Sequence, residues 1–175
     1  HACQAGPLNP RLESALEALP NLRLPAARFL GVEDADLQLV NGMEAFLATF
    51  GRKAAGGWPS EGAISERSLE RMGAAGYRWA ASDEDVLFAS LGESLPVEPG
   101  AKEARRAALL YRPWRHKDGP VLLFRDHDLS DRIGFAYATR APEDAARDFV
   151  SRLLHLRETL PDDDTPYVVS VILDG

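Results

Sequence analysis

The chain has 175 residues, of which 45% are hydrophobic and 27% are charged, a composition typical of a globular domain and unlike that of disordered or fibrous proteins. Its 27 acidic and 20 basic residues give a formal net charge of -7, which repels phosphate backbones and argues against a nucleic-acid partner. The single cysteine excludes an internal disulfide and indicates a cytoplasmic protein. No apolar run approaches the ~18 residues of a membrane helix, so we expect no membrane partner.

Both ends of the sequence indicate an excised piece. It begins HACQAGPLNP without an initiator methionine, and it stops at Gly175 directly after the apolar run YVVSVILD. A buried strand that ends the chain leaves nothing to cover its far side. We therefore predict that residues 1–175 form a single segment of a larger domain, truncated at both ends.

The first half of the chain predicts two helices around a short extended segment. Apolar residues recur every three or four positions from Val32 to Phe50, as an amphipathic helix requires, and Gly51 is placed to end it. An extended stretch over 54–59 leads into Glu61. Ser65 then caps a predicted helix over about 66–75.

The second half predicts strands in alternation with helices. Residues 92–108 contain two prolines and two glycines and are predicted to be an irregular excursion. The predicted strands are YRWAA (77–81), LLYRPWR (109–115), VLLFRD (121–126) and YVVSVILD (167–174), the middle two forming a hairpin around HKDGP, and the predicted helices cover 83–91, 129–138 and 142–160. This alternation predicts an α/β fold with mostly parallel strands and outer helices.

Four carboxylates fall at or just after the carboxyl ends of extended segments, namely Glu61, Asp83, Asp126 and Asp174. In parallel α/β folds this edge of the sheet is where active sites form. Aspartate is also a good helix N-cap, so Asp83 and Asp126 could equally serve to start the helices that follow them. Glutamate caps poorly, and the functional interpretation is therefore stronger for Glu61.

The surroundings of Glu61 are typical of a carbohydrate-processing site. The chain reads GGWPSEGAIS, with Trp58 three residues before Glu61. Glycosidases need a rigidly held carboxylate beside a sugar ring, and an indole gives that ring a stacking face. A buried tryptophan beside a surface glutamate would give the same pattern, so this spacing alone leaves both interpretations open.

Other candidate residues also have two interpretations. Trp114 follows a proline near a predicted strand end and could be core or sugar platform. The RDHD sequence places Arg125 beside Asp126 and His127, and Arg125 could pair with Asp126 or Asp131 or orient a catalytic carboxylate. His127 also raises a metal site, but no second histidine is suitably spaced, and we predict neither a metal nor a cofactor.

Several segments in the same order resemble glycoside hydrolase family 57, in its bacterial α-amylase/α-mannosidase-like branch. The segments are GGWPSEGAISERSLERMGAAGYRWAASDEDVL, LYRPWR, FRDHDLSDRIGFAY and VVSVILDG. The resemblance implies that the chain is part of a distorted (β/α)7 barrel. It also implies a retaining enzyme, with Glu61 of the W-x-x-E-like motif as nucleophile and Asp174, before Gly175, as acid/base.

The resemblance further implies a substrate. The expected substrate is an α-glucan or maltooligosaccharide, bound by Trp58, Asp83, Asp126, His127, Trp114 and, in a stretch resembling a family loop that begins with histidine, His1. A retaining mechanism expects the two catalytic carboxyl groups about 5 to 5.5 Å apart. The family's first motif, His-Gln-Pro, is absent from this chain.

Two other functions remain open. The first is a metal-dependent carbohydrate deacetylase on a related barrel, favoured by RDHD and opposed by the lack of a His-x-x-x-His pair. The second is a non-catalytic α-glucan-binding module. Within the resemblance, the sequence does not separate hydrolase, branching and transferase activities, and it does not indicate the oligomeric state.

Overall fold

The computed structural model describes residues 31–92 and 99–173. The chain divides into two compact units. The described part of the first unit runs to Ala81 and is completed by Arg115–Leu122, whereas the second contains Ser82–Trp114 and the residues from Leu123 onward. The chain therefore passes between the two units three times.

The strands within the described residues form one sheet with the order β1-β2-β4-β3. These strands are β1 (Gly56–Gly57), β2 (Trp79–Asp83), β3 (Trp114–Arg115) and β4 (Val121–Arg125). β1 pairs with β2 in parallel, as predicted. β3 and β4 are hydrogen-bonded neighbours joined by five residues, which confirms the predicted hairpin because parallel neighbours need a longer crossover.

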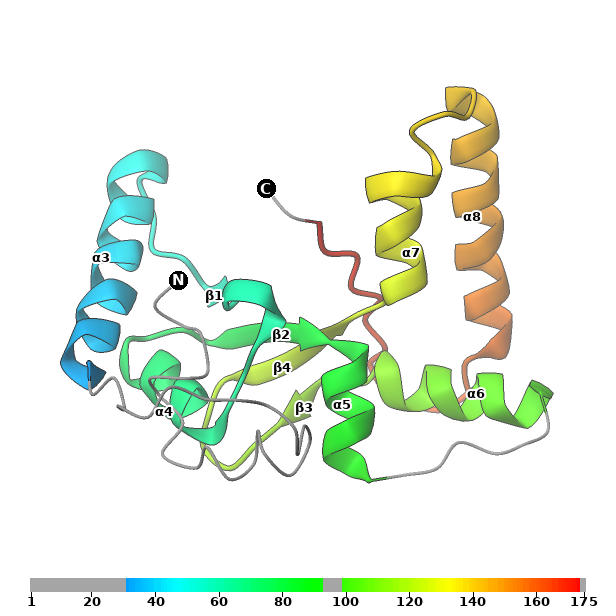
Figure 1. The fold of residues 1–175 in the computed structure, drawn as a ribbon. Helices are drawn as coiled ribbons and strands as arrows, with labels where there is room; N and C mark the ends of the chain where they lie inside the picture. The colour runs from blue at the N-terminus through cyan, green and yellow to red at the C-terminus, as the bar shows by residue number, and fades with distance from the viewer. Residues whose placement is uncertain (1–30, 93–98, 174–175) are drawn as a thin grey trace, which may run out of the picture. The chain divides into compact units, whose positions relative to one another are not determined.

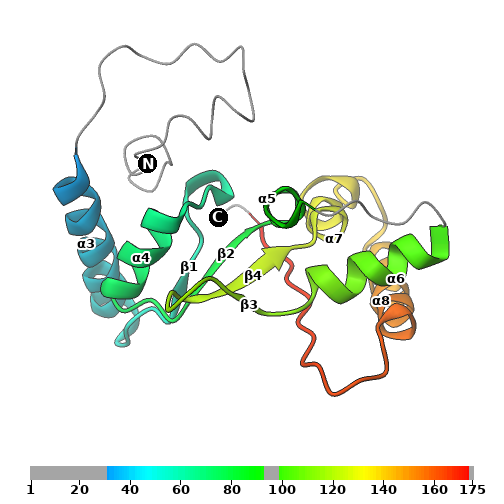
Figure 2. The same cartoon turned by 90° about the horizontal axis from the view of Figure 1, so that it is seen from below.

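The first unit packs helix α3 (Val32–Phe50) beside helix α4 (Glu66–Ala74), as both views show (Figure 1 and Figure 2). An ion pair between Arg71 and Asp36 joins the two helices. The Tyr77 hydroxyl donates to the Leu39 carbonyl oxygen at 3.3 Å. The apolar core here is formed by Ala35, Leu39, Met43, Leu69, Met72, Ala80 and Ala81.

Both helices of the first unit begin and end close to the predicted positions. Gly51 ends α3 in the left-handed conformation, at φ 69°, where glycine carries no steric penalty. Ser65 caps α4 by accepting from the Ser68 backbone N–H at 3.2 Å. The periodicity and capping arguments are therefore confirmed for this part of the chain.

The second unit is largely helical. Its elements are α5 (Glu84–Leu91), α6 (Pro99–Leu110), α7 (His127–Asp131), the π-helical turn η2 (Arg132–Ala136) and α8 (Pro142–Thr159). Figures 1 and 2 both place α8 beside α7, and Arg152 of α8 bonds Asp128 of α7 at 3.3 Å. The core contains Leu87, Ala107, Leu109, Leu110, Tyr111, Phe124 and Leu129.

Two predictions in this unit are wrong. Helix α6 covers most of the predicted excursion over 92–108, and it continues through Leu110 into the predicted strand 109–115. The apolar run Leu109–Tyr111 is buried, and a short buried run reads the same in a helix as in a strand. What remains of the predicted strand is β3.

The predicted final strand over 167–174 is also wrong in its described part. Residues 167–173 form a single parallel bridge, between Ser170 and Arg125, so the predicted direction is confirmed but the ladder is not. Val168 and Leu173 are 41% and 46% exposed, which contradicts burial on both faces. This segment is consequently positioned by a few individual contacts.

Candidate active site

Glu61 lies in a tight turn directly after β1, in the 3-10 helix η1 (Ser60–Gly62). Its backbone is left-handed, with φ 56° and ψ 23°, a conformation that strains a residue with a Cβ atom. Pro59, which is buried, accepts from the Gly62 N–H at 2.9 Å and closes the turn. The turn leaves the Glu61 side chain exposed and Trp58 half-buried.

The strand before Glu61 depends on glycine. A Cβ atom at Gly56 would lie 2.0 Å from ring atoms of Trp79, so the indole occupies the space that any side chain would need. Gly56 pairs with Trp79 in the parallel register of β1 and β2. Trp79 thus acts as a structural contact that packs β1 against β2, and this pairing fixes where the turn with Glu61 begins.

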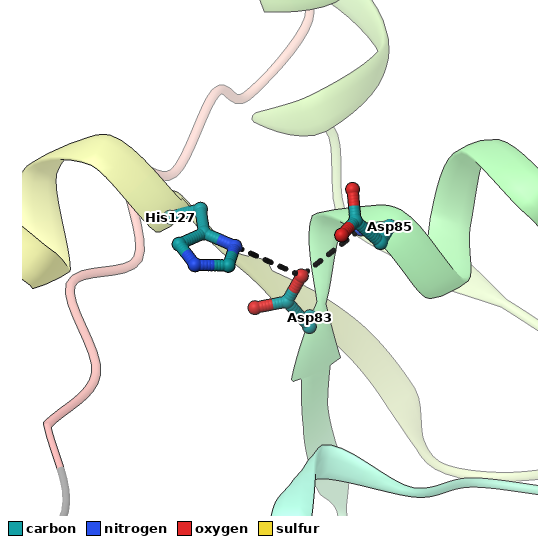
Figure 3. A group of neighbouring side chains, drawn as sticks. All are labelled: Asp83, Asp85 and His127. Atoms are coloured by element: carbon teal, nitrogen blue, oxygen red, sulfur yellow. Dashed lines mark hydrogen bonds and ion pairs between the residues drawn. The ribbon is translucent and has the colours of Figure 1, made fainter.

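Asp83 ends β2 and caps α5 in the second unit. Its carboxylate accepts from the Asp85 backbone N–H at 3.1 Å, which confirms the capping interpretation. The His127 ring nitrogen Nδ1 lies 3.5 Å from the same oxygen, and Figure 3 shows Asp85 and His127 on either side of Asp83. The end of β2 and the start of α7 therefore place a carboxylate and an imidazole side by side.

Arg125 links Asp83 to Asp131 of α7. Its Nη1 lies 3.0 Å from an Asp83 carboxylate oxygen, and its Nη2 pairs with Asp131. Burial disfavours the guanidinium charge, but the hydrogen bonds to Asp83 and Asp131 outweigh it and raise the pKa of Arg125. Asp131 also lies 3.1 Å from Nε2 of His127, one helical turn earlier. We refer to Asp83, Arg125, His127 and Asp131 as the Asp83 cluster.

Asp126 lies among different partners, although it neighbours the cluster in sequence. It is 2% exposed, accepts from the Leu129 N–H at 2.8 Å to cap α7, and receives a hydrogen bond from the Tyr111 hydroxyl. Burial and that hydrogen bond raise the pKa of Tyr111, which stays a neutral donor. The capping interpretation is therefore confirmed for Asp126 as well.

Arg106 completes this buried network. It pairs with Glu84 and lies 3.6 Å from Asp126. Burial raises the pKa of the Glu84 carboxyl group, against the opposing effect of the Arg106 charge. These contacts join α5, α6 and the start of α7.

A family model decides which class of protein carries these residues. The model of glycosyl hydrolase family 57 matches residues 11–175. The chain belongs to this family. A search of curated protein sequences found no match.

The fold agrees with the family assignment. The chain is similar to the crystal structure of 4-α-glucanotransferase from Thermococcus litoralis, with a TM-score of 0.53 and 19% sequence identity over 82% of this chain. The match covers 19% of that enzyme, so this family 57 chain spans a small part of its relative's length. At this identity the likeness shows the α/β fold. Within the described residues, no helix is long and apolar enough to cross a membrane.

The remaining predicted site residues are placed differently. Trp114 is half-buried and its indole N–H donates to the Leu109 carbonyl oxygen at 2.9 Å, which anchors the end of α6. His1 and Asp174 lie outside the described residues. The expected separation of the Glu61 and Asp174 carboxyl groups therefore stays a prediction.

A group that could hold a metal ion adjoins the Asp83 cluster. Asp83, Asp85 and His127 each offer a ligand atom, and these atoms lie within 4.8 Å of one another. Carboxylate and imidazole ligands suit a divalent metal. The other carboxylate oxygen of Asp83 is 3.0 Å from the Arg125 guanidinium, however, and a fixed positive charge at that distance opposes cation binding.

A polar cavity of about 390 Å³ lies between α6, α7 and α8. The charges along it are paired: Arg152 bonds Asp128 and Asp148, and His155 lies 3.0 Å from Glu103. Hydrogen bonds from Arg152 and Tyr137 lower the pKa of Asp148 to about 2. These pairs join the three helices, and we assign the cavity a structural role.

Sequence reasoning did not single out Tyr111, Arg106 or Glu84 as site residues, and it named Asp131 only as a possible partner of Arg125. Tyr111 and Arg106 fell in segments predicted as strand and irregular chain, whereas Arg106 lies in α6 and Tyr111 directly follows that helix. Asp131 carried a usable signal, because it follows His127 by four residues and thus lies on the same face of one helix.

Proposed function

We propose that the protein is a retaining glycoside hydrolase or transglycosylase that acts on the α-glucosidic bonds of α-glucans in the cytoplasm. Glu61 carries the proposal. It occupies a strained left-handed turn at a strand end with its carboxylate exposed, and backbone strain of this kind concentrates at functional sites. Membership of family 57 supplies the reaction class, and the match to a 4-α-glucanotransferase supports an α-glucan substrate.

The proposed reaction is a double displacement. A Glu61 carboxylate oxygen attacks the anomeric carbon while Asp174 protonates the departing glycosidic oxygen, which breaks the bond and forms a glycosyl ester. Asp174 then removes a proton from water or from an acceptor sugar hydroxyl. The resulting oxygen nucleophile attacks the anomeric carbon and releases Glu61.

We assign substrate contacts to Asp83 and His127 of the Asp83 cluster and to Trp58 beside Glu61. Asp83 is half-buried and His127 is exposed, so both can reach a ligand. Asp126 is enclosed by Tyr111, Leu129 and Arg106, and we assign it to supporting the cluster.

The test is turnover of maltooligosaccharides and glycogen by the full-length protein, with product anomers followed by NMR. Glu61→Gln and Asp174→Asn should each abolish turnover, and the wild type should retain the anomeric configuration. Glu44→Gln, at an exposed carboxylate of α3, is the matched control and should behave like wild type. Full activity of Glu61→Gln, or inverted products, would refute the proposal.

The group of Asp83, Asp85 and His127, which could hold a metal ion, favours a second candidate, a metal-dependent carbohydrate deacetylase. It predicts a stoichiometric metal in the purified protein, release of acetate from acetylated sugars, and loss of that activity with a chelator. The hydrolase proposal expects turnover of α-glucans that a chelator leaves unchanged. Measuring both activities with and without chelator separates the two.

A further inference from the structure

Arg125 holds three separate parts of the second unit with one side chain. It is the last residue of β4, and its side chain is 18% exposed. Nη1 donates to Asp83 at the end of β2, Nη2 pairs with Asp131 at the end of α7, and Nε donates to the Ile172 carbonyl oxygen at 3.1 Å. Every nitrogen of the guanidinium therefore has an assigned acceptor.

The contact with Ile172 matters because, within the described residues, few hydrogen bonds hold the segment after Ser170. Residues 167–173 lack a strand ladder and make one bridge, at Ser170. The Asp126 N–H donates to the Ser170 carbonyl oxygen at 2.9 Å. Ser130 Oγ accepts from the Ile172 N–H at 3.2 Å. After Ser170, therefore, the side chains of Arg125 and Ser130 hold the backbone at Ile172.

Asp174, the proposed acid/base, follows Ile172 by two residues in the sequence. We propose that Arg125 is a positioning residue for the acid/base: by binding the Ile172 carbonyl oxygen it fixes the backbone two residues before Asp174, and it ties Asp83 and Asp131 to the same segment. This inference rests on the proposed function and adds a residue to its mechanism.

Lysine cannot replace arginine in this role. A guanidinium presents its donors in a rigid planar fork, whereas an ammonium group is a point charge on a flexible stem. Arg125→Lys keeps the positive charge beside Asp83 and Asp131 but cannot reach three acceptors in fixed directions. It therefore separates the positioning of the Ile172 backbone from the presence of a charge.

The experiment compares two substrates in the full-length protein. Maltooligosaccharides need a proton on the leaving oxygen, whereas α-maltosyl fluoride releases fluoride with little help from an acid. With Arg125→Lys we expect kcat/KM for maltooligosaccharides to fall about 10²-fold, since small misplacements have effects of that size. General acid catalysis contributes about 10²–10⁴-fold, so the fall with maltosyl fluoride should be at least about tenfold smaller.

Arg132→Lys is the matched control. Arg132 has a similarly covered side chain, at 21% exposure, and pairs with Asp128 and Asp148, and within the described residues its ion pairs do not involve Ile172. We expect this variant to retain wild-type kinetics on both substrates. Ser130→Ala removes the other side-chain contact to Ile172 without changing charge, and it should show the same substrate dependence as Arg125→Lys. If Arg125→Lys does not fold, the kinetics of Ser130→Ala on the two substrates test the inference instead.

Equal losses on the two substrates, or kinetics of Arg125→Lys and Ser130→Ala that match those of Arg132→Lys, would overturn the inference. The proposed function is tested separately by Glu61→Gln and Asp174→Asn. If those two variants are inactive while Arg125→Lys matches Arg132→Lys, the proposed function stands and Arg125 has no positioning role. If Glu61→Gln is fully active, both proposals fall.

Discussion

Replacing Tyr111 with phenylalanine removes one hydrogen-bond donor from a buried carboxylate and leaves the aromatic ring in place. Tyr111 is fully buried and Asp126 is 2% exposed, so water cannot take the place of the lost hydroxyl. A hydrogen bond to a charged group contributes about 1.5–3 kcal/mol. The ring volume is conserved, so no cavity term is added. We expect the free energy of unfolding to fall by about 2 kcal/mol.

Tyr137→Phe is the matched control, because the Tyr137 hydroxyl also donates to an aspartate, Asp148, at 2.7 Å. That carboxylate is partly exposed and also bonded by Arg152, so the change should lower the free energy of unfolding by clearly less than Tyr111→Phe does. The measurement is urea unfolding followed by circular dichroism, with unchanged m-values. If Tyr111→Phe and Tyr137→Phe lower the free energy of unfolding by amounts that agree within about 0.5 kcal/mol, burial does not strengthen the Tyr111–Asp126 hydrogen bond.

The Tyr111 variant also has a pH signature. The pKa of Tyr111 is raised in the folded state, chiefly by burial. A raised pKa contributes stability that is present below the unfolded pKa, near the ordinary value of 10.0, and is lost as the pH rises beyond it. Phenylalanine has no such group, so the difference in stability between wild type and Tyr111→Phe should shrink above about pH 10.

Two further predictions concern the first unit and the surface of the second. Gly56→Ala forces a Cβ atom to within 2.0 Å of Trp79 and should lower the free energy of unfolding by about 1–3 kcal/mol. The control is Gly100→Ala, where a Cβ atom would have no atom within 4 Å, and this variant should be neutral or stabilising. Equal effects of the two variants in urea unfolding would contradict the close approach at Gly56. The pKa of Asp148 is lowered from 3.8 to about 2, so its contribution to stability is present above the unfolded pKa and is lost as the pH falls through about 2. The melting temperature of Asp148→Asn should therefore fall less than that of wild type across this acid range, and parallel curves would disprove the contribution.

The sequence predicted those helices whose signals are local. α3 follows from apolar spacing, the start of α8 from Pro142 and the start of α4 from Ser65, because these signals lie within or next to the helix itself. α6 was missed although it is rich in alanine, lysine, arginine and glutamate, all strong helix formers, with Pro99 at its start. The prediction took Pro99 and Gly100 as signs of irregular structure, although both lie in the first turn of α6.

The candidate site was predictable in position but not in pairing. The fold class places the ends of β2 and β4 at a sheet edge, so Asp83 and Asp126 could be located from strand and helix signals. The sequence left Asp126 and Asp131 as possible partners of Arg125, and no local signal indicated Asp83, which lies 42 residues earlier. The structure pairs Arg125 with Asp83 and Asp131 rather than with its neighbour Asp126, since adjacent residues at the end of a strand point to opposite faces.

Two aspartates with the same local sequence role lie in different chemical surroundings. Asp83 and Asp126 each follow a strand and each cap a helix. The Asp126 side chain is buried, and its carboxylate oxygens accept hydrogen bonds from the Tyr111 hydroxyl and the Leu129 N–H. One carboxylate oxygen of Asp83 accepts a hydrogen bond from Arg125, and the Asp83 side chain remains partly exposed. A carboxylate can bind a substrate only if it keeps acceptors open to solvent. Burial, which capping signals do not encode, therefore supports a structural role for Asp126 and agrees with our proposal that Asp83 contacts the substrate.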